Sequence, residues 1–451
     1  MGARATFLRW RIRRNYNAGN HEKARLLALR HFDKQPTFCY DIVLRALWNL
    51  DRYQDLLDFS ALHPEFNSFD YVRKASQKLR RKVEMVAPPS EIFGKTWNAE
   101  QLIDNWYQIE NTLWLRHPGG WVHWEMPDGF ELRKTHPSLL ELALQVLLTP
   151  LIGTFPSIKT EQRQKGKNIG LAFSGGIDSM AASILLPEET ILAYHRRNFE
   201  SILHHGLANE LFMRIEETSG RHVLQVPSNH ELLRHQIGKP TGFSTDLAAG
   251  VHLLLLADHL DLGTVAFGTP IDNTWLSKGR RFRDFSASNY WLKWTKRFNH
   301  AGLRLEFPIN HISEAGAIEI CKQHPLLPYI NSCLRGDGSI GCGKCWKCFH
   351  KNGPLGRSFD VNSPEVSSFL TKTPLRTAQH ALWAIQYLGL ETHVPHLNPS
   401  LQDDLNWWTG YYPPGLNLIE EPLRNHVESI TNRFLAPMPF PYSLEQVNIE
   451  Q

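Results

Sequence analysis

The chain has 451 residues, of which 42% are hydrophobic and 21% charged, and its formal net charge is +4. These values are typical of a globular protein, and the length suggests two to four structural units. The sequence has no uninterrupted apolar run of membrane-spanning length and no signal-peptide pattern, so we expect a cytoplasmic protein with no membrane partner; the small positive charge does not favour nucleic acid as a partner.

Residues 1–95 have a helical pattern. Two segments of similar texture, 20–27 and 51–58, each precede a proline, which is typical of helical hairpins of a tetratricopeptide-like kind. Such hairpins would offer a docking surface for a protein or peptide partner, and a plain helical subdomain is the alternative. The first twenty residues carry five arginines and no acid, which we interpret as a solvated basic helix face.

Residues 96–160 are predicted to form a β-meander followed by a helix. Strand-like residues between 113 and 132 are interrupted by Pro-Gly-Gly at 118–120 and by Pro-Asp-Gly at 127–129, which are turn signals. A helical pattern follows at 138–148.

Residues 161–360 are predicted to form an α/β domain, because strand and helix patterns alternate there as in a parallel sheet covered by helices on both faces. An apolar run at 169–173 leads into the sequence Ser-Gly-Gly-Ile-Asp-Ser at 174–179 and then into an apolar helix. Two consecutive glycines let the backbone approach an anion, and the amides of a helix N-terminus favour negative charge. We therefore predict a pyrophosphate-binding loop formed by Ser174, Gly175, Gly176, Asp178 and Ser179.

Two later strands should end near this loop. The apolar segments 191–194 and 264–267 end at Tyr194 and Gly268. Ligands of parallel α/β sheets bind beyond the carboxyl ends of the strands, so both residues are expected at the nucleotide site.

Four of the six cysteines are Cys333, Cys342, Cys345 and Cys348, with the spacing C-x8-C-x2-C-x2-C. Four thiolates at such a spacing suit a closed tetrahedral zinc site, which is the predicted site. A disulfide pair and an iron–sulfur cluster are the alternatives.

The loop and the cysteine spacing together resemble one family, the 7-cyano-7-deazaguanine synthases (QueC-like proteins) of the PP-loop ATP pyrophosphatase superfamily. Ser332 before the first cysteine and Lys351 three positions after the last also fit, although arginine is more usual at the second position. The resemblance spans residues 167–353. It implies that ATP is cleaved to AMP and pyrophosphate with Mg²⁺ near Asp178, while a carboxylate is adenylated and converted to an amide or a nitrile.

The segments that would recognise the nucleobase differ from the family pattern. Of the family's Tyr-Gly-Gln-Arg-His, only Tyr194 and Arg197 are present, and residues 269–275 lack the expected Asn-Ala-x-Asp. The resemblance therefore implies that the nucleotide chemistry is retained while the substrate differs. It assigns catalytic roles to Asp178, Ser179, Arg197 and Lys351, and Arg196 and Arg335 are further candidates for guiding a carboxylate or phosphate.

Residues 361–451 are predicted to be helical and then rich in proline. Trp407, Trp408, Tyr411 and Tyr412 lie within six residues. Aromatic residues at this density can stack on a base, but more often they fasten a terminal segment onto a core.

These features favour a QueC-like, ATP-dependent, carboxylate-activating ligase with Mg²⁺ and Zn²⁺. Its substrate would be a deazapurine-type base or a protein or peptide partner docked on the helical extensions. QueC-like proteins with extra domains occur in bacterial anti-phage systems, so the resemblance extends to a role in antiviral defence. A tRNA-modifying PP-loop enzyme and a non-catalytic nucleotide-binding scaffold are the alternatives.

Overall fold

The computed structural model describes residues 3–449 except 64, 67–70, 73–74, 76–85, 154, 156–159, 200, 202, 337–339 and 372–374. The chain forms two compact units. The first, here called the helical unit, consists of Met1–Met85 and Val361–Leu370, and the second, the sheet unit, of Val86–Asp360 and Thr371–Gln451. Part of the predicted N-terminal helical region, residues 76–85, lies outside the described residues.

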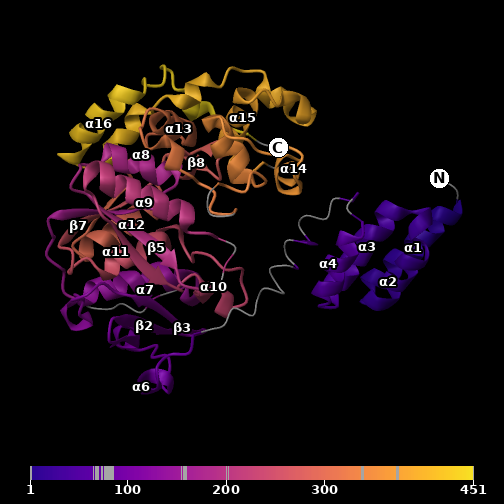
Figure 1. The fold of residues 1–451 in the computed structure, drawn as a ribbon, viewed down its shortest axis with the longest axis horizontal. Coiled ribbons are helices and arrows are strands. Elements are labelled where there is room, and N and C mark those ends of the chain that lie inside the picture. Colours follow the sequence, from indigo (N-terminus) through magenta and orange to yellow (C-terminus); the bar gives the residue numbers. More distant parts are fainter. Residues whose placement is uncertain are drawn as a thin grey trace. The chain divides into compact units, whose positions relative to one another are not determined.

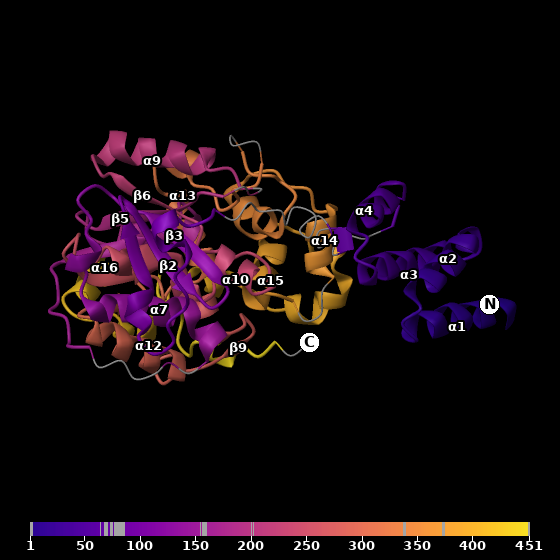
Figure 2. The same cartoon turned by 90° about the horizontal axis from the view of Figure 1, so that it is seen from below.

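The helical unit consists of short helices around a small apolar core (Figures 1 and 2). Helix α2 packs against both α1 and α3, and α3 packs against α4. Helix α3 contributes the apolar stripe Cys39, Val43 and Leu47, which recurs every four residues and is buried. Its first residue is Pro36, at a position where the missing N–H has no intrahelical partner to lose. The bounds are α1 Ala3–Asn17, α2 His21–Arg30, α3 Pro36–Asn49, α4 Tyr53–Ala61 and α14 Pro364–Leu370.

The sheet unit is built on an eight-stranded mixed sheet, which confirms the predicted α/β class. The strand order is β1-β2-β3-β6-β5-β4-β7-β10, with parallel pairing from β6 to β10 and antiparallel pairing from β1 to β6. The bounds are β1 Trp106–Ile109, β2 Thr112–His117, β3 Gly120–Glu125, β4 Asn168–Ala172, β5 Ile191–Arg197, β6 Val223–Ser228, β7 Leu262–Phe267 and β10 Arg304–Glu306. A separate two-stranded sheet pairs β8 Leu276–Ser277 with β9 Arg281–Phe282.

The predicted meander is present as β1 to β3, and it continues the parallel sheet. Trp124 of β3 pairs with Ser228 of β6. Residues 96–160 therefore share one sheet and one compact unit with residues 161–360, whereas the sequence pattern had divided them. The physical reason is that β3 would otherwise leave one edge of β6 unpaired.

The chain reverses direction across the sheet at β4. From β4 it proceeds through α8 to β5 and through α9 to β6, and it then returns to the other side of β4 to form β7 and β10. Because parallel crossovers are right-handed, this reversal puts the connecting helices on opposite faces. Accordingly, α8 packs on α13, while α7 packs on α11 and α12. The remaining helices are α6 Ser90–Phe93, α7 Pro137–Ile152, α8 Ile177–Leu185, α9 Gly206–Ser219, α10 Leu232–Gln236, α11 Val251–Leu255, α12 Asn289–His300, α13 Glu314–Lys322, α15 Ala378–Tyr387 and α16 Leu423–Phe434.

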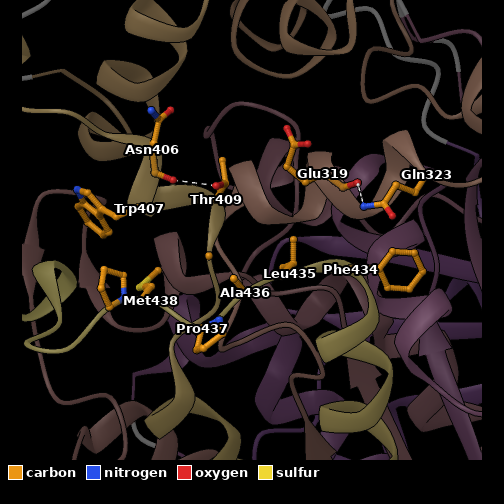
Figure 3. A pocket seen from close by; sticks show the side chains of 12 residues that line it. Glu319, Gln323, Asn406, Trp407, Thr409, Phe434, Leu435, Ala436, Pro437 and Met438 are labelled. Atoms are coloured by element: carbon orange, nitrogen blue, oxygen red, sulfur yellow. Dashed lines mark hydrogen bonds between the residues drawn. The ribbon is translucent and has the colours of Figure 1, made fainter.

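The C-terminal aromatic segment packs onto the core of the sheet unit. Trp408 is fully buried and its carbonyl accepts a hydrogen bond from the Ser313 hydroxyl, while Tyr411 and Tyr412 are also buried. Trp407 alone of the four aromatic residues lines a shallow depression of about 380 Å³ beside α13 (Figure 3). The packing interpretation of this segment is therefore confirmed for three of the four. Within the described part of the chain, no helix is both long and apolar enough to cross a membrane.

Candidate active site

The loop between β4 and α8 is a tight turn that is stabilised by hydrogen bonds between its own residues. Gly175 has φ +73, a left-handed conformation that glycine adopts without strain. The Ser179 hydroxyl accepts a hydrogen bond from the Ser174 amide at 3.2 Å and donates one to the Gly176 carbonyl oxygen at 3.0 Å. Ser179 was predicted to contact a phosphate, and in this structure it stabilises the turn, leaving the exposed Ser174 hydroxyl nearer to solvent.

Gly268 lies at the end of β7 and packs directly on this turn. A Cβ built at Gly268 would lie 2.9 Å from the Asp178 carbonyl group and 2.9 Å from the Cα of Ser179. Only a residue without a side chain allows β7 to approach the first turn of α8 so closely. The strands on either side of the chain reversal thus meet at this loop, as the sequence predicted.

A buried ion-pair cluster joins the loop to two distant segments. Lys351, in the π-helical turn Cys348–Asn352, places its Nζ 2.5 Å from Oδ2 of Asp178 and 3.5 Å from Oε2 of Glu314. The amide of Glu314, the first residue of α13, donates to Oδ2 of Asp272 at 2.9 Å. Three carboxyl groups therefore gather around one ammonium group; we call these four residues the Lys351 cluster.

Burial is the largest influence on the carboxyl groups of the Lys351 cluster, and it disfavours their charged forms. It raises the pKa of Asp178 despite the nearby ammonium, and it raises the pKa of Asp272 well above its usual range, with the charge of Glu314 adding to the effect. Burial also opposes ionisation of Glu314, but Lys351 and two neighbouring histidines outweigh it and hold the pKa of Glu314 well below its usual range. The environment of the cluster therefore favours the charged forms of Glu314 and Lys351 and disfavours the charged form of Asp272.

Three carboxyl oxygens of the cluster lack a hydrogen-bond partner among the described residues, and of these only Oε2 of Glu314 is held by ion pairs. Oδ1 of Asp178 and Oδ1 of Asp272 are buried and have no hydrogen-bond partner among the described residues. Such oxygens are the ligands that Mg²⁺ prefers, and a divalent ion would offset the excess of carboxyl groups over cations. These two oxygens are therefore the candidate ligands for the predicted magnesium ion.

Two buried histidines lie behind Glu314. Nδ1 of His350 is 3.2 Å and Nε2 of His380 is 3.5 Å from Oε2 of Glu314, and the same nitrogen of His380 lies 2.8 Å from the His350 carbonyl oxygen. Burial lowers the pKa of His380 to about 3 and also lowers the pKa of His350, so both rings are neutral. The three side chains have the spacing of a metal site, but the Lys351 ammonium already supplies the cation there.

The four cysteines predicted to bind zinc converge. The Sγ atoms of Cys333 and Cys342, of Cys333 and Cys345, and of Cys345 and Cys348 are each 3.6 Å apart, and those of Cys342 and Cys348 are 3.9 Å apart. Zinc–sulfur bonds of about 2.3 Å in a tetrahedron require sulfur atoms about 3.8 Å apart. All four are free thiols too far apart for disulfides, and too close together to surround a cluster of several iron and sulfide ions. The site therefore fits a single ion such as zinc.

Both ends of the cysteine segment contact the loop or the first turn of α8. Ser332, directly before the first cysteine, accepts a hydrogen bond at 3.1 Å from the amide of Ile177, the first residue of α8. Lys351 follows the last cysteine by three residues and pairs with Asp178 of the same helix turn. An ion bound by the cysteines would therefore fix both contacts, because it ties the two ends of the segment together.

Tyr194 and Arg197 are both on β5, but their side chains lie on opposite faces of the sheet. The Tyr194 hydroxyl is 2.6 Å from Nδ1 of His205, and its ring packs on Phe212 of α9. Arg197 instead binds both carboxyl oxygens of Glu231, whose pKa falls to about 2 because hydrogen bonds from His195 and Arg197 outweigh the cost of burial. The predicted catalytic Arg197 thus already has its charge neutralised.

Sequence reasoning did not identify Glu314 and His380 as members of the site, and it placed Asp272 near the loop only as the end of the segment that follows β7. Asp272 lies in the segment that departs from the family pattern, and Glu314 follows the N-cap residue Ser313. An acidic residue in the first turn of a helix is common for electrostatic reasons alone, so it carries no signal of a buried cluster. Only the fold brings these residues to Lys351.

A family of unknown function (DUF6395) has a model that matches residues 293–440. The match covers about a third of the chain; it includes Glu314, the four cysteines, Lys351 and His380, but not the loop at 174–179. No curated protein matches the sequence.

Proposed function

We propose that the protein is an ATP-dependent ligase that activates a carboxylate and forms AMP and pyrophosphate. The observation that carries the proposal is the loop at 174–179, which lies where the chain reverses across the sheet and whose own Asp178 has a buried carboxyl oxygen with no hydrogen-bond partner among the described residues. Such a reversal creates the crevice in which open α/β sheets bind ligands. The resemblance of the loop and cysteine spacing to the QueC-like family supports the same reaction.

In the proposed reaction, the β- and γ-phosphates of ATP bind to those backbone amides of the loop and of the first turn of α8 that do not already donate to the Ser174, Ser179 and Ser332 hydroxyls. Ser174 is exposed, and we assign its hydroxyl, which lies 3.0 Å from the Ser179 hydroxyl, to the same phosphates. Lys351, held by two carboxylates, adds a positive charge next to the same turn. These groups stabilise the charge that develops on pyrophosphate as the substrate carboxylate attacks the α-phosphorus and the bond to the bridging oxygen breaks.

Asp178 and Asp272 would hold Mg²⁺, which when bound neutralises phosphate charge. Because the pKa of each is raised by burial, ion binding would compete with a proton at these carboxyl groups. Lys351 would then serve both to balance Glu314 and to contact phosphate.

Arg196 is the better candidate for guiding a carboxylate than Arg197. Its Nη1 contacts Oε1 of Gln225 at 2.8 Å and Oδ1 of Asn209 at 3.3 Å, and both of these partners are neutral. It also lies on the same face of β5 as Tyr194, next to α9. Its positive charge therefore remains available to an anionic substrate.

The proposal is tested by the products formed from ATP, Mg²⁺, a carboxylate and ammonia, which displaces AMP from the acyl-adenylate and gives the amide. The first acceptor to supply is 7-carboxy-7-deazaguanine, alone and together with candidate protein partners, and nucleotides are separated by chromatography. We expect AMP and pyrophosphate. Asp178→Asn should abolish them, whereas Asp128→Asn in the turn after β3, the matched control at an exposed position, should not.

Formation of ADP and orthophosphate would contradict the proposal. Because Asp178 also pairs with Lys351, thermal melts of both variants separate a loss of chemistry from a loss of folding. An Asp178→Asn protein that unfolds normally and still forms AMP would remove this residue from the mechanism.

A further inference from the structure

The positive charge of the protein is concentrated in the helical unit. Residues 1–85 contain 17 lysines and arginines against nine acidic residues, whereas residues 86–451 contain 32 against 36. The small net charge of the whole chain is therefore the sum of a strongly basic part and a slightly acidic part. A basic region of this kind attracts polyanions, which the total charge does not reveal.

Helix α1 presents much of this charge to solvent. Leu8, Ile12 and Tyr16 recur every four residues and pack into the core of the helical unit. The opposite side carries Arg11, Arg13 and Arg14, all exposed. None of these three forms a salt bridge within the described part of the chain, so their charges are available to a partner.

Aromatic side chains lie among these arginines. Phe7 is 63% and Trp10 is 53% exposed, and their rings stack with centroids 5.8 Å apart. The Arg14 guanidinium lies over the Trp10 ring at 5.2 Å, and a shallow depression along the helix runs past Trp10 and Arg13. Two neighbouring exposed rings flanked by arginines offer a flat apolar surface that a planar ligand can cover.

We infer that this face of α1, formed by Phe7, Trp10, Arg11, Arg13 and Arg14, binds single-stranded nucleic acid. Arginine guanidinium groups pair with phosphates in two-point contacts and stack on bases, and every exposed base offers a face to Trp10 or Phe7. An acidic protein segment would also pair with the arginines, but its binding would not require the two exposed rings of Phe7 and Trp10 beside them. The inference concerns the helical unit and is independent of the proposed ligase reaction.

The test uses the full-length protein and fluorescein-labelled oligo(dT) and oligo(U) of about 20 nucleotides, at about 50 mM and then 200 mM salt. Fluorescence anisotropy should show binding that weakens steeply with salt. Arg13→Glu with Arg14→Glu should weaken binding at least tenfold. It should also make the slope of log K against log salt concentration less steep, by the equivalent of roughly one to two phosphate contacts. Trp10→Ala should weaken it roughly five- to a hundredfold through lost stacking.

The matched control reverses the same amount of charge elsewhere. Arg133 and Lys134 are 83% and 69% exposed in the sheet unit, and changing both to Glu should leave binding within twofold. A labelled polyglutamate of equal charge should bind more weakly than the oligonucleotides. The inference is overturned if neither oligonucleotide binds at low salt, if the two double variants behave alike, or if polyglutamate binds as tightly and Trp10→Ala has no effect, which would indicate an acidic protein partner.

Discussion

The Lys351 cluster and the solvent face of α1 hold their charges in opposite ways. Around Lys351, ionisable side chains from four segments pack against one another, and two carboxyl oxygens have neither a hydrogen bond nor an ion pair in the described structure. On α1, the arginines come from one helix and stay in water. Removing one member of a buried cluster leaves uncompensated charge, whereas removing an exposed arginine costs almost nothing in stability. Substitutions in the Lys351 cluster should therefore lower the free energy of unfolding much more than substitutions on α1, even if both regions bind anions.

The largest effect should come from the cysteine site. Cys345→Ser or prolonged chelation should remove about one zinc per chain and lower the melting temperature strongly, because a structural zinc site contributes its binding energy to folding. Zinc is measured by elemental analysis and unfolding by circular dichroism. Cys39→Ser, which replaces a buried thiol of the helical unit, should leave the metal content unchanged.

A protein that contains no zinc when purified, or that contains several irons and is brown, would contradict this assignment. If the cysteine segment also positions the loop, as Ser332 and Lys351 indicate, zinc loss should weaken binding of an ATP analogue as well.

The next largest effect should come from the cluster itself. Lys351→Met should destabilise the protein by about 3–5 kcal/mol, because it leaves buried carboxylates without their cation. Lys322→Met is the comparison: Lys322 pairs with Glu319 at 2.6 Å, but both side chains are partly exposed. Its loss should cost about 1 kcal/mol or less. Urea unfolding followed by tryptophan fluorescence measures both, and equal costs would show that the Lys351 cluster is not effectively buried.

Acidification should weaken the sheet unit through its buried histidines. Burial lowers the pKa of His252, His311 and His380 to about 3, against 6.5 when unfolded. A folded-state pKa below the unfolded value gives stability that is complete above pH 6.5 and is lost as the pH falls toward 3. Each histidine should therefore cost about 1.4 kcal/mol per pH unit below about pH 6.5.

Urea unfolding at about pH 7.5 and pH 5.5 tests this. His311 contacts the Thr431 hydroxyl at 3.0 Å, and His311→Gln keeps a hydrogen-bonding side chain without a titrating ring. The variant should lose roughly 1 kcal/mol less than the unmodified protein over the same interval. An identical pH dependence in both would show that His311 is not kept neutral by folding.

The smallest effect should come from α1. Arg13→Glu with Arg14→Glu should change the free energy of unfolding by about 1 kcal/mol or less, because both side chains are exposed and without acidic partners among the described residues, and Arg14 loses only the interaction of its charge with the C-terminus of α1. Chemical denaturation measures this change. A larger loss would mean that the arginines support the helical unit and are not held available for a ligand.

The sequence predicted the local parts of the fold and site well. The apolar run before Ser174 is β4, the helix after it is α8, and the segments ending at Tyr194 and Gly268 are β5 and β7. These elements depend on short-range patterns of apolar residues and glycines, which are visible in a single sequence. The meander was also predicted, but its place at the edge of the main sheet was not, because strand pairing between remote segments leaves no periodic signal.

By itself, therefore, the sequence determined which residues form the strand, turn and helix of the loop, and which four cysteines share a spacing suited to one ion. Only the tertiary structure decided that Lys351 reaches Asp178 across 173 residues, that Arg197 is neutralised by Glu231, and that the basic charge belongs to one compact unit. Turn geometry and ligand spacing are properties of neighbouring residues. Burial, charge pairing and the separation of charge between units arise only when distant segments are brought together, since each depends on which groups exclude water from one another.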